Sequence, residues 1–276
     1  MKKIYRFLFI LSLFVLSVPV LGAQSFEGLQ SLKGLSLNGA TGLYTIPSGR
    51  IGWEQSSNLG LDLGYHAIFA DPANHLVKIN VSLFKWVEIS GAFDFQRDHS
   101  SASDDYKPNN DFILGGKLQL PVTNTAVAIG GNVQFIDIGN RSSSYYRTVG
   151  QIYLAATYPG SFFKMPSETT VTIGYSFREY NNSNINFGMG FDLLLFPNIL
   201  DRYVHWLVDF SNYSYSDDAQ GAEAEWRGCL NTGIRIDLSA IPALNKFKLV
   251  LDVMLVDAFD QNRTFSVGAV FGFAVL

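Results

Sequence analysis

Short runs in which apolar residues alternate one for one with polar or small residues recur from residue 57 to the end of the chain. The first run is residues 59–66, Leu-Gly-Leu-Asp-Leu-Gly-Tyr-His, and the last is residues 265–273. Because successive side chains of a β-strand point to opposite faces, each run predicts a strand with one apolar face and one polar face. A soluble sandwich buries its apolar faces, whereas a transmembrane barrel turns them outward to the lipid.

Residues 1–23 have the pattern of a cleaved secretory signal peptide. Lys2, Lys3 and Arg6 precede an apolar stretch at residues 7–20, and small residues follow it. A retained membrane helix fits less well, because this stretch is shorter than the ~20 residues that a span needs. Export and alternation together predict an all-β fold. We expect a transmembrane antiparallel up-and-down β-barrel at residues 57–276, located in the bacterial outer membrane.

The composition agrees with an exported barrel. Hydrophobic residues make up 47 % of the chain, yet after the signal peptide no run reaches the ~18 continuous apolar residues of a membrane helix. The 22 Phe and 13 Tyr residues are numerous enough to supply aromatic girdles at both membrane interfaces. A single cysteine, Cys229, excludes an intramolecular disulfide framework, and a net charge of −4 gives no nucleic-acid signature.

The alternating runs number about twelve, with ten and fourteen strands as alternatives. If the first strand runs outward from the periplasm, the even-numbered connections should be short, as at residues 84–86 and 197–200. The odd-numbered ones should be long and polar, as at residues 97–110. The connection at residues 159–167 departs from this trend, because it is long for a periplasmic turn.

Residues 24–56 do not follow the strand pattern, because glycines and Pro47 interrupt them. Two interpretations stay open for this segment. One is a periplasmic lead-in that packs against the base of the barrel, and the other is a plug that folds into the lumen. The candidate plug residues are Thr41, Gly42, Leu43, Tyr44, Pro47 and Arg50.

Two short segments resemble known sequences. Residues 42–50, Gly-Leu-Tyr-Thr-Ile-Pro-Ser-Gly-Arg, resemble the opening segment of the YjbH-like outer-membrane proteins, and similar openings occur in spirochaetal barrels. That resemblance implies an outer-membrane barrel with a role in exopolysaccharide production or export. Ser266, Gly268, Phe271 and Phe273 resemble the terminal β-signal, which implies the barrel-assembly machinery as a partner.

The residues expected to face the lumen include charged side chains of both signs in nearly equal number. As pore-lining residues we predict Asp62, His66, Lys78, Glu88, Asp94, Lys117, Arg178, Asp192, His205, Asp209, Arg227, Arg235, Asp237, Lys248 and Asp252. The balance of signs predicts weak ion selectivity. Cross-strand ion pairs are the alternative role, with Asp62–Lys78, Glu88–Lys117 and Asp237–Lys248 as the expected pairs.

Catalytic and metal-binding patterns are absent from the sequence. Its four histidines have no evident serine partner, and no zinc spacing, phosphate loop or metalloprotease motif occurs. We therefore expect neither an enzyme nor a cofactor, and no nucleic-acid partner. Two classes of function remain: a small passive channel for ions or small polar solutes, or a closed barrel that acts as a scaffold, adhesin or exopolysaccharide-export partner. Outer-membrane lipid, and for the channel small polar solutes, are the expected partners.

Overall fold

The computed structural model describes residues 34–53, 58–70, 73–97, 110–122, 124–136, 147–178, 184–200, 202–212, 228–244, 246–259 and 263–275. The signal peptide predicted at residues 1–23 and the following ten residues lie outside these ranges.

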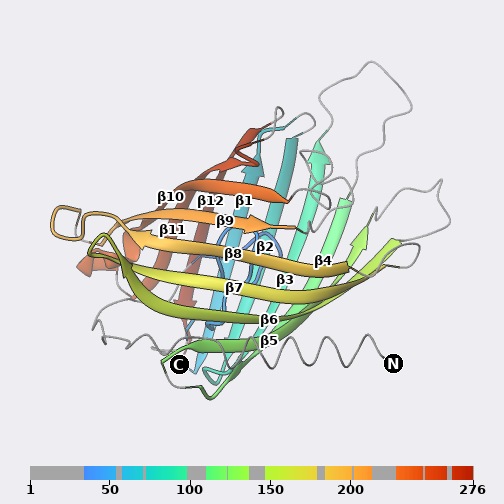
Figure 1. The fold of residues 1–276 in the computed structure, drawn as a ribbon, viewed down its shortest axis with the longest axis horizontal. Helices are drawn as coiled ribbons and strands as arrows, with labels where there is room; N and C mark the ends of the chain where they lie inside the picture. The colour runs from blue at the N-terminus through green and yellow to red at the C-terminus, as the bar shows by residue number, and fades with distance from the viewer. Residues whose placement is uncertain are drawn as a thin grey trace.

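Twelve antiparallel strands form one closed barrel (Figure 1). They are β1 (Leu59–Ile68), β2 (Ala73–Leu83), β3 (Val87–Arg97), β4 (Asn110–Leu120), β5 (Ala126–Ile136), β6 (Arg147–Phe162), β7 (Met165–Arg178), β8 (Asn184–Leu194), β9 (Val204–Ser211), β10 (Cys229–Asp237), β11 (Phe247–Val256) and β12 (Thr264–Ala274). Each strand pairs with the next along the chain, and β12 closes the barrel on β1, with Phe271 opposite Leu63. The predicted up-and-down barrel of twelve strands is confirmed, and the alternatives of ten and fourteen strands are wrong.

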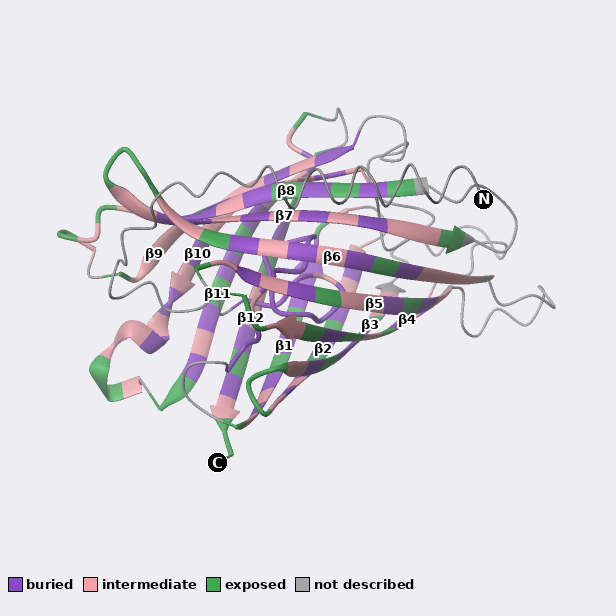
Figure 2. Ribbon diagram, turned by 60° about the horizontal axis from the view of Figure 1, so that its bottom comes forward, coloured by how far each residue is buried: buried purple, intermediate pink, exposed green. Residues whose placement is uncertain are grey.

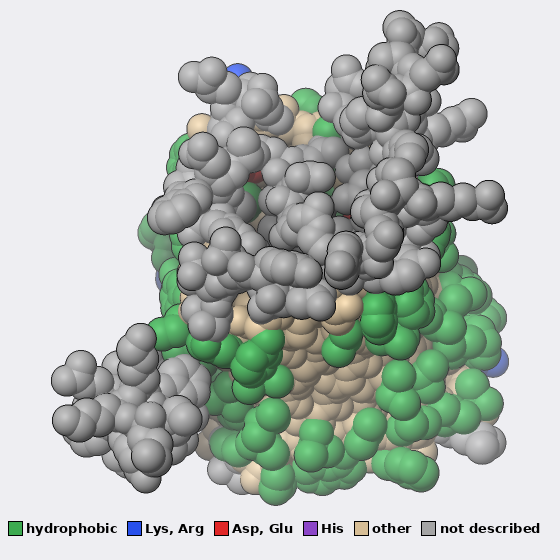
Figure 3. Space-filling model, turned by 90° about the vertical axis from the view of Figure 1, so that its right-hand side faces the viewer, with side chains coloured by type: hydrophobic (Ala, Val, Ile, Leu, Met, Phe, Trp, Pro, Cys, Tyr) green, Lys and Arg blue, Asp and Glu red, His purple; other side chains and the backbone are tan. Residues whose placement is uncertain are grey.

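The outer face of the barrel is apolar. Buried and exposed residues alternate along the strands (Figure 2), and the outward side chains are large hydrophobic ones. Examples are Leu63, Val77, Ile89, Leu114, Ile129, Ile152, Met189, Val253 and Phe265. The outer wall visible in Figure 3 is accordingly made of hydrophobic and uncharged side chains. Strands of 8 to 16 residues with an apolar outer face can cross a bilayer, which identifies the fold as a transmembrane barrel of the outer-membrane type.

The short connections gather at one end of the barrel. They join β2 to β3, β4 to β5, β6 to β7 and β8 to β9, and the chain ends beside them with β12 (Figure 1). Short turns are typical of the periplasmic end of such barrels. The prediction of a long connection at residues 159–167 is wrong. Strands β6 and β7 extend through these residues and leave a turn of only two residues, Phe163 and Lys164.

That turn has unusual backbone angles. Phe163 and Lys164 both have positive φ, 48° and 65°. A two-residue hairpin turn of this kind favours Asn and Gly, whereas a bulky residue there costs about 1–2 kcal/mol. The usual turn residues are therefore missing at this position. Pro159 and Gly160 precede this turn, and they gave residues 159–167 the composition of a loop.

Helical structure is slight in the described part of the chain. Two 3₁₀ turns, η1 (Leu238–Ala240) and η2 (Pro242–Leu244), join β10 to β11. The Asp237 carboxylate caps η1 by accepting a hydrogen bond from the Ser239 amide at 3.0 Å. Within the ranges that the structure describes, no helix has the length and apolarity to cross a membrane.

Residues 34–53, called the luminal segment below, lie inside the barrel (Figure 1). The segment contains no helix or strand, only the isolated bridges Leu35–Thr41 and Gly42–Pro47. Almost all of its residues are buried, and the barrel wall surrounds them. Its backbone groups must therefore find hydrogen-bond partners on the inner face of the wall.

Candidate functional site in the barrel lumen

Most residues predicted to line the pore have buried side chains on the inner face of the wall. This group comprises Asp62, His66, Lys78, Glu88, Lys117, Asp192, Asp209, Arg235, Asp237, Lys248 and Asp252. Asp94 and His205 lie on the same face and are partly buried. The side chain of Arg178 and all of Arg227 lie outside the described residues. The structure brings most of the first group against the luminal segment. Six of these side chains bond backbone groups of the segment: Lys78, Glu88, Lys117, Asp209, Arg235 and Lys248.

Glu88 and Lys117 hold the middle of the luminal segment. The Glu88 carboxylate accepts hydrogen bonds from the Thr41 amide at 2.8 Å and from the Gly52 amide at 3.3 Å. Lys117 donates to the carbonyl oxygens of Thr41 and Ser48, at 3.0 and 3.1 Å. The two side chains also pair with each other at 3.2 Å, on adjacent strands β3 and β4. This ion pair therefore binds both an N–H donor and C=O acceptors of the luminal segment.

Asp209 and Arg235 hold the turn of the segment at residues 42–45. The Asp209 carboxylate accepts hydrogen bonds from the Tyr44 and Thr45 amides, at 2.9 and 2.6 Å. Arg235 donates to the Gly42 carbonyl at 3.2 Å, and its guanidinium also makes two hydrogen bonds to Asp252, at 2.7 and 2.9 Å.

Further charged side chains hold the two ends of the segment. Lys78 donates to the carbonyl oxygens of Leu35 and Ser36, at 2.8 and 3.2 Å. Lys248 donates to the Gly52 carbonyl at 3.2 Å and pairs with Asp62 at 2.7 Å.

Two side chains of the luminal segment itself bind wall carboxylates. The Trp53 indole donates to Asp62 at 2.8 Å. Arg50 pairs with Glu168 on β7 at 2.7 Å. The segment is thus attached through both its backbone and its side chains.

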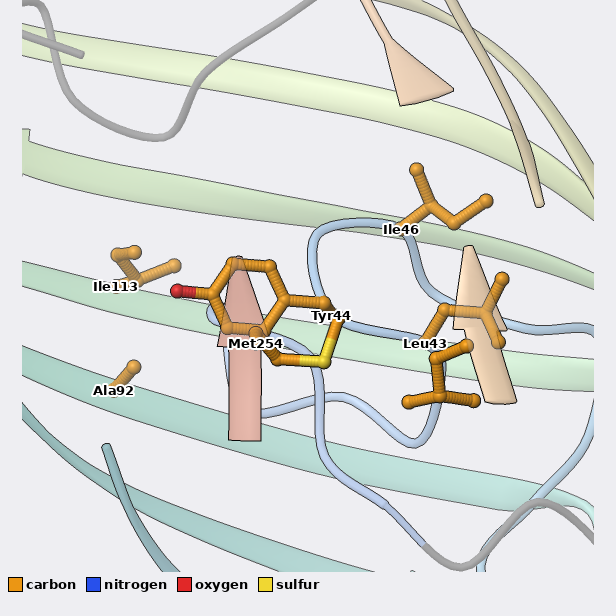
Figure 4. Close-up of a cluster of buried hydrophobic side chains, with 7 residues drawn as sticks. Leu43, Tyr44, Ile46, Ala92, Ile113 and Met254 are labelled. Carbon is orange, nitrogen blue, oxygen red and sulfur yellow. The ribbon is translucent and has the colours of Figure 1, made fainter. Parts of the chain in front are cut away.

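A cluster of apolar side chains lies beside these polar contacts (Figure 4). Leu43, Tyr44 and Ile46 of the luminal segment are buried against wall residues. The wall residues of the cluster are Ala92, Ile113, Leu207 and Met254. Leu35 packs in a second cluster, against Val250 and Val270. The segment thus carries a small core of its own inside a polar wall.

Two of the predicted ion pairs are wrong. Lys78 bonds the luminal segment instead of Asp62, and Asp62 pairs with Lys248 across the closing strand β12. Asp237 does not pair with Lys248 and instead caps η1. The predicted pair of Glu88 and Lys117 is present. The error for Lys78 arises because only pairs between adjacent strands were expected, whereas an irregular peptide lies in the lumen and accepts its hydrogen bonds.

Several side chains that contact the segment were not among the predicted residues. Glu168 was missed because residues 159–167 had the composition of a loop, so the strand predicted after them began too late to include it. Asn80 donates to the Gly39 carbonyl at 3.0 Å, and Thr157 accepts from the Gly49 amide at 2.9 Å. Uncharged polar residues on an inward face carry no sequence signal that separates a binding role from ordinary wall lining.

His66 and His205 each contact an aspartate of the wall. His66 lies 3.4 Å from Asp252, and its ring centroid is 5.8 Å from that of Tyr44. His205 contacts Asp192 at 2.6 Å. In the described ranges, no group of three or more His, Cys, Asp or Glu side chains is arranged to hold a metal ion.

Neither a protein-family model nor a curated protein matches the sequence. Solved structures of outer-membrane barrels do match it. The KdgM porin aligns with 78 % of this chain and 99 % of its own, at 7 % identity and a TM-score of 0.49. The NanC porin aligns with 79 % and 100 %, at 10 % identity and a TM-score of 0.49. The outer-membrane protein Omp33 of Acinetobacter baumannii aligns with 80 % and 100 %, at 11 % identity and a TM-score of 0.44. The barrel fold of this chain is established by its own strand pairing, independently of these similarities.

Proposed function

We propose that the chain is an outer-membrane channel for ions or small polar solutes, and that the luminal segment closes it. One observation carries this proposal: Glu88, Lys117 and Arg235, which hold the segment, also pair with oppositely charged side chains of the wall. Glu88 pairs with Lys117, and Asp252 with Arg235. Withdrawal of the segment leaves these pairs intact and facing water, and it exposes Lys78 and Asp209 to water as well. A lone buried charge would be costly, whereas a hydrated ion pair is not.

The size of the barrel supports a passage once the segment has moved. Eight strands enclose a space that side chains fill, and sixteen or more leave an aqueous channel. Twelve strands lie between these limits, and here twenty residues of peptide fill the space between the inward side chains of the wall. With both signs of charge on the wall, we expect the open channel to be weakly selective.

No enzymatic step belongs to this proposal. His66 and His205 each face an aspartate of the wall and have the role of polar lining residues. A hydrolase of lipid would instead need a nucleophile and its base facing the bilayer.

Single-channel conductance in a planar bilayer tests the proposal. We compare the mature chain with a variant that lacks residues 34–53, after heat-modifiable migration on a gel has shown that both barrels are folded. The variant should conduct in steps that grow with salt concentration, and the mature chain should be closed or should open rarely. A folded variant that stays silent would refute the channel.

A permanently closed barrel is the second candidate, and the apolar cluster around Leu43, Tyr44 and Ile46 favours it. A segment with its own core resists withdrawal. Residues 42–50, which carry the resemblance to YjbH-like proteins, belong to this segment. In this case the barrel would serve as a scaffold, for example for exopolysaccharide export. Deletion of residues 34–53 would then abolish partner binding and leave the membrane impermeable.

We also propose that β12 is the strand read by the barrel-assembly machinery. It is the last strand of the barrel, it closes the barrel on β1, and Phe271 is exposed on its outer face. Phe271→Ala should lower the amount of folded barrel in the outer membrane, whereas Val267→Ala, also outward on β12, should not. Equal amounts of the two variants would contradict the assignment.

A further inference from the structure

Exposed aromatic rings stand beside exposed lysines at the periplasmic turns. Three turns share this arrangement: Phe84 with Lys85, Phe163 with Lys164, and Phe247 with Lys246. Arg202, at the turn between β8 and β9, is exposed as well. Across the ranges that the structure describes, the exposed charged residues of this end are all cations.

Two of these turns adopt a backbone that their residues disfavour. Phe84 and Lys85 have φ of 52° and 65°, and Phe163 and Lys164 have φ of 48° and 65°. The same Phe-Lys dipeptide thus occupies the left-handed region twice, where Asn and Gly are preferred. The turn between β4 and β5 uses such a residue, Asn124, at φ 65°. Both turns depart from the preference for Asn and Gly, and both do so with the same dipeptide. This repeated departure points to a function of the Phe and Lys side chains.

The side chains point away from the protein. Phe163 is 82 % exposed and Phe84 is 70 % exposed, so most of the surface of each ring faces away from the barrel. The contact of the Phe163 ring is with Phe162 at the end of β6, with ring centroids 4.5 Å apart. Aromatic rings at this height of a membrane protein sit among the lipid headgroups. A lysine beside such a ring is placed to meet a phosphate, and clusters of basic residues attract anionic lipid.

We propose that the periplasmic turns form a binding surface for anionic phospholipid headgroups, with the rings as anchors and Lys85, Lys164 and Lys246 as the phosphate contacts. The charge on this end favours a phosphatidylglycerol-type headgroup over a zwitterionic one. The surface lies outside the lumen, so it does not depend on whether the barrel conducts.

Lipid retention measured by native mass spectrometry tests the proposal. The barrel is equilibrated in mixed micelles with equal amounts of phosphatidylglycerol and phosphatidylcholine, and the bound lipids are counted. The wild type should retain phosphatidylglycerol preferentially, and each Lys→Gln change at these three positions should weaken that retention by about fivefold. Arg263→Gln, which removes an exposed cation at the opposite end, is the matched control and should change nothing.

A second variant separates lipid binding from folding. The double change Phe163→Asn with Lys164→Gly supplies residues that suit the turn, so the barrel should fold and its melting temperature in neutral micelles should not fall. It should nevertheless lose phosphatidylglycerol. The proposal is overturned if the wild type retains both lipids equally, or if this variant melts earlier in neutral micelles, because the side chains would then stabilise the barrel itself.

Discussion

Replacement of Asp209 by leucine should release the luminal segment while the barrel stays folded. The Asp209 carboxylate accepts hydrogen bonds from the Tyr44 and Thr45 amides, at 2.9 and 2.6 Å. A hydrogen bond to a charged group contributes about 1.5–3 kcal/mol. Leucine has a similar size and accepts no hydrogen bond, so the segment should lose about 3–6 kcal/mol of docking free energy. The ratio of released to docked segment should rise by a factor between about 10² and 10⁴.

Two measurements detect the release of the luminal segment in the Asp209→Leu variant. Channel openings in a planar bilayer should become more frequent, and trypsin should cleave the folded barrel after Arg50, which is held against Glu168 in the wild type. Asp192→Leu is the matched control. Asp192 is also a buried aspartate of the inner wall, on the adjacent strand β8, but its carboxylate contacts His205 of the wall.

The result that refutes this reasoning is a folded Asp209→Leu barrel that resists trypsin and opens as rarely as the Asp192→Leu control. The luminal segment would then be held by its apolar cluster and not by the charges of the wall. If trypsin cleaves the segment and the barrel still does not conduct, the segment is held as described but does not close a channel.

Three further changes test other parts of the structure. Gly39→Ala should destabilise the luminal segment by about 1–3 kcal/mol, because Gly39 has φ of 85° and an added Cβ would lie 2.5 Å from a carbonyl oxygen of β3; thermal unfolding measures the loss. Val133→Arg should cost about 2–4 kcal/mol in lipid vesicles, because Val133 faces the lipid, whereas Gln134→Arg on the opposite face should cost much less; unfolding in urea compares the two. Lys117→Met should cost about 3–5 kcal/mol by leaving Glu88 without its cation, and Lys117→Met with Glu88→Leu should cost less than the sum of the single changes in a double-mutant cycle of thermal unfolding.

The barrel was predictable because the bilayer constrains every strand in the same way. Each strand must keep one face apolar along its length, so the alternation in β1 and β12 is visible without any knowledge of their partners. The prediction of strand ends failed where two strands continue beyond the part of their sequence that alternates. β6 and β7 extend to Phe162 and Met165, and Pro159 and Gly160 interrupt the pattern there.

The sequence left two positions open for the luminal segment, against the base of the barrel or inside the lumen, because the contacts that hold it involve residues far away in the sequence. Tyr44 and Asp209 are 165 residues apart, and Gly52 and Lys248 are 196 apart. Such contacts produce no period in the sequence of the segment. The same reason explains the wrong partners of Lys78 and Asp62: a rule that pairs neighbouring strands cannot take account of a peptide between them.

The balance of charges on the inner wall has a physical cause in the peptide group. An irregular peptide presents nearly equal numbers of N–H donors and C=O acceptors, and it needs partners for both. Here carboxylates such as Glu88 and Asp209 take the amides, and cations such as Lys117 and Lys78 take the carbonyls. A wall that faces a charged solute would instead favour one sign. In this chain, the balanced inward charges of the barrel strands and the aperiodic segment before the first strand therefore have one physical explanation, since the charges of both signs bond the peptide held in the lumen.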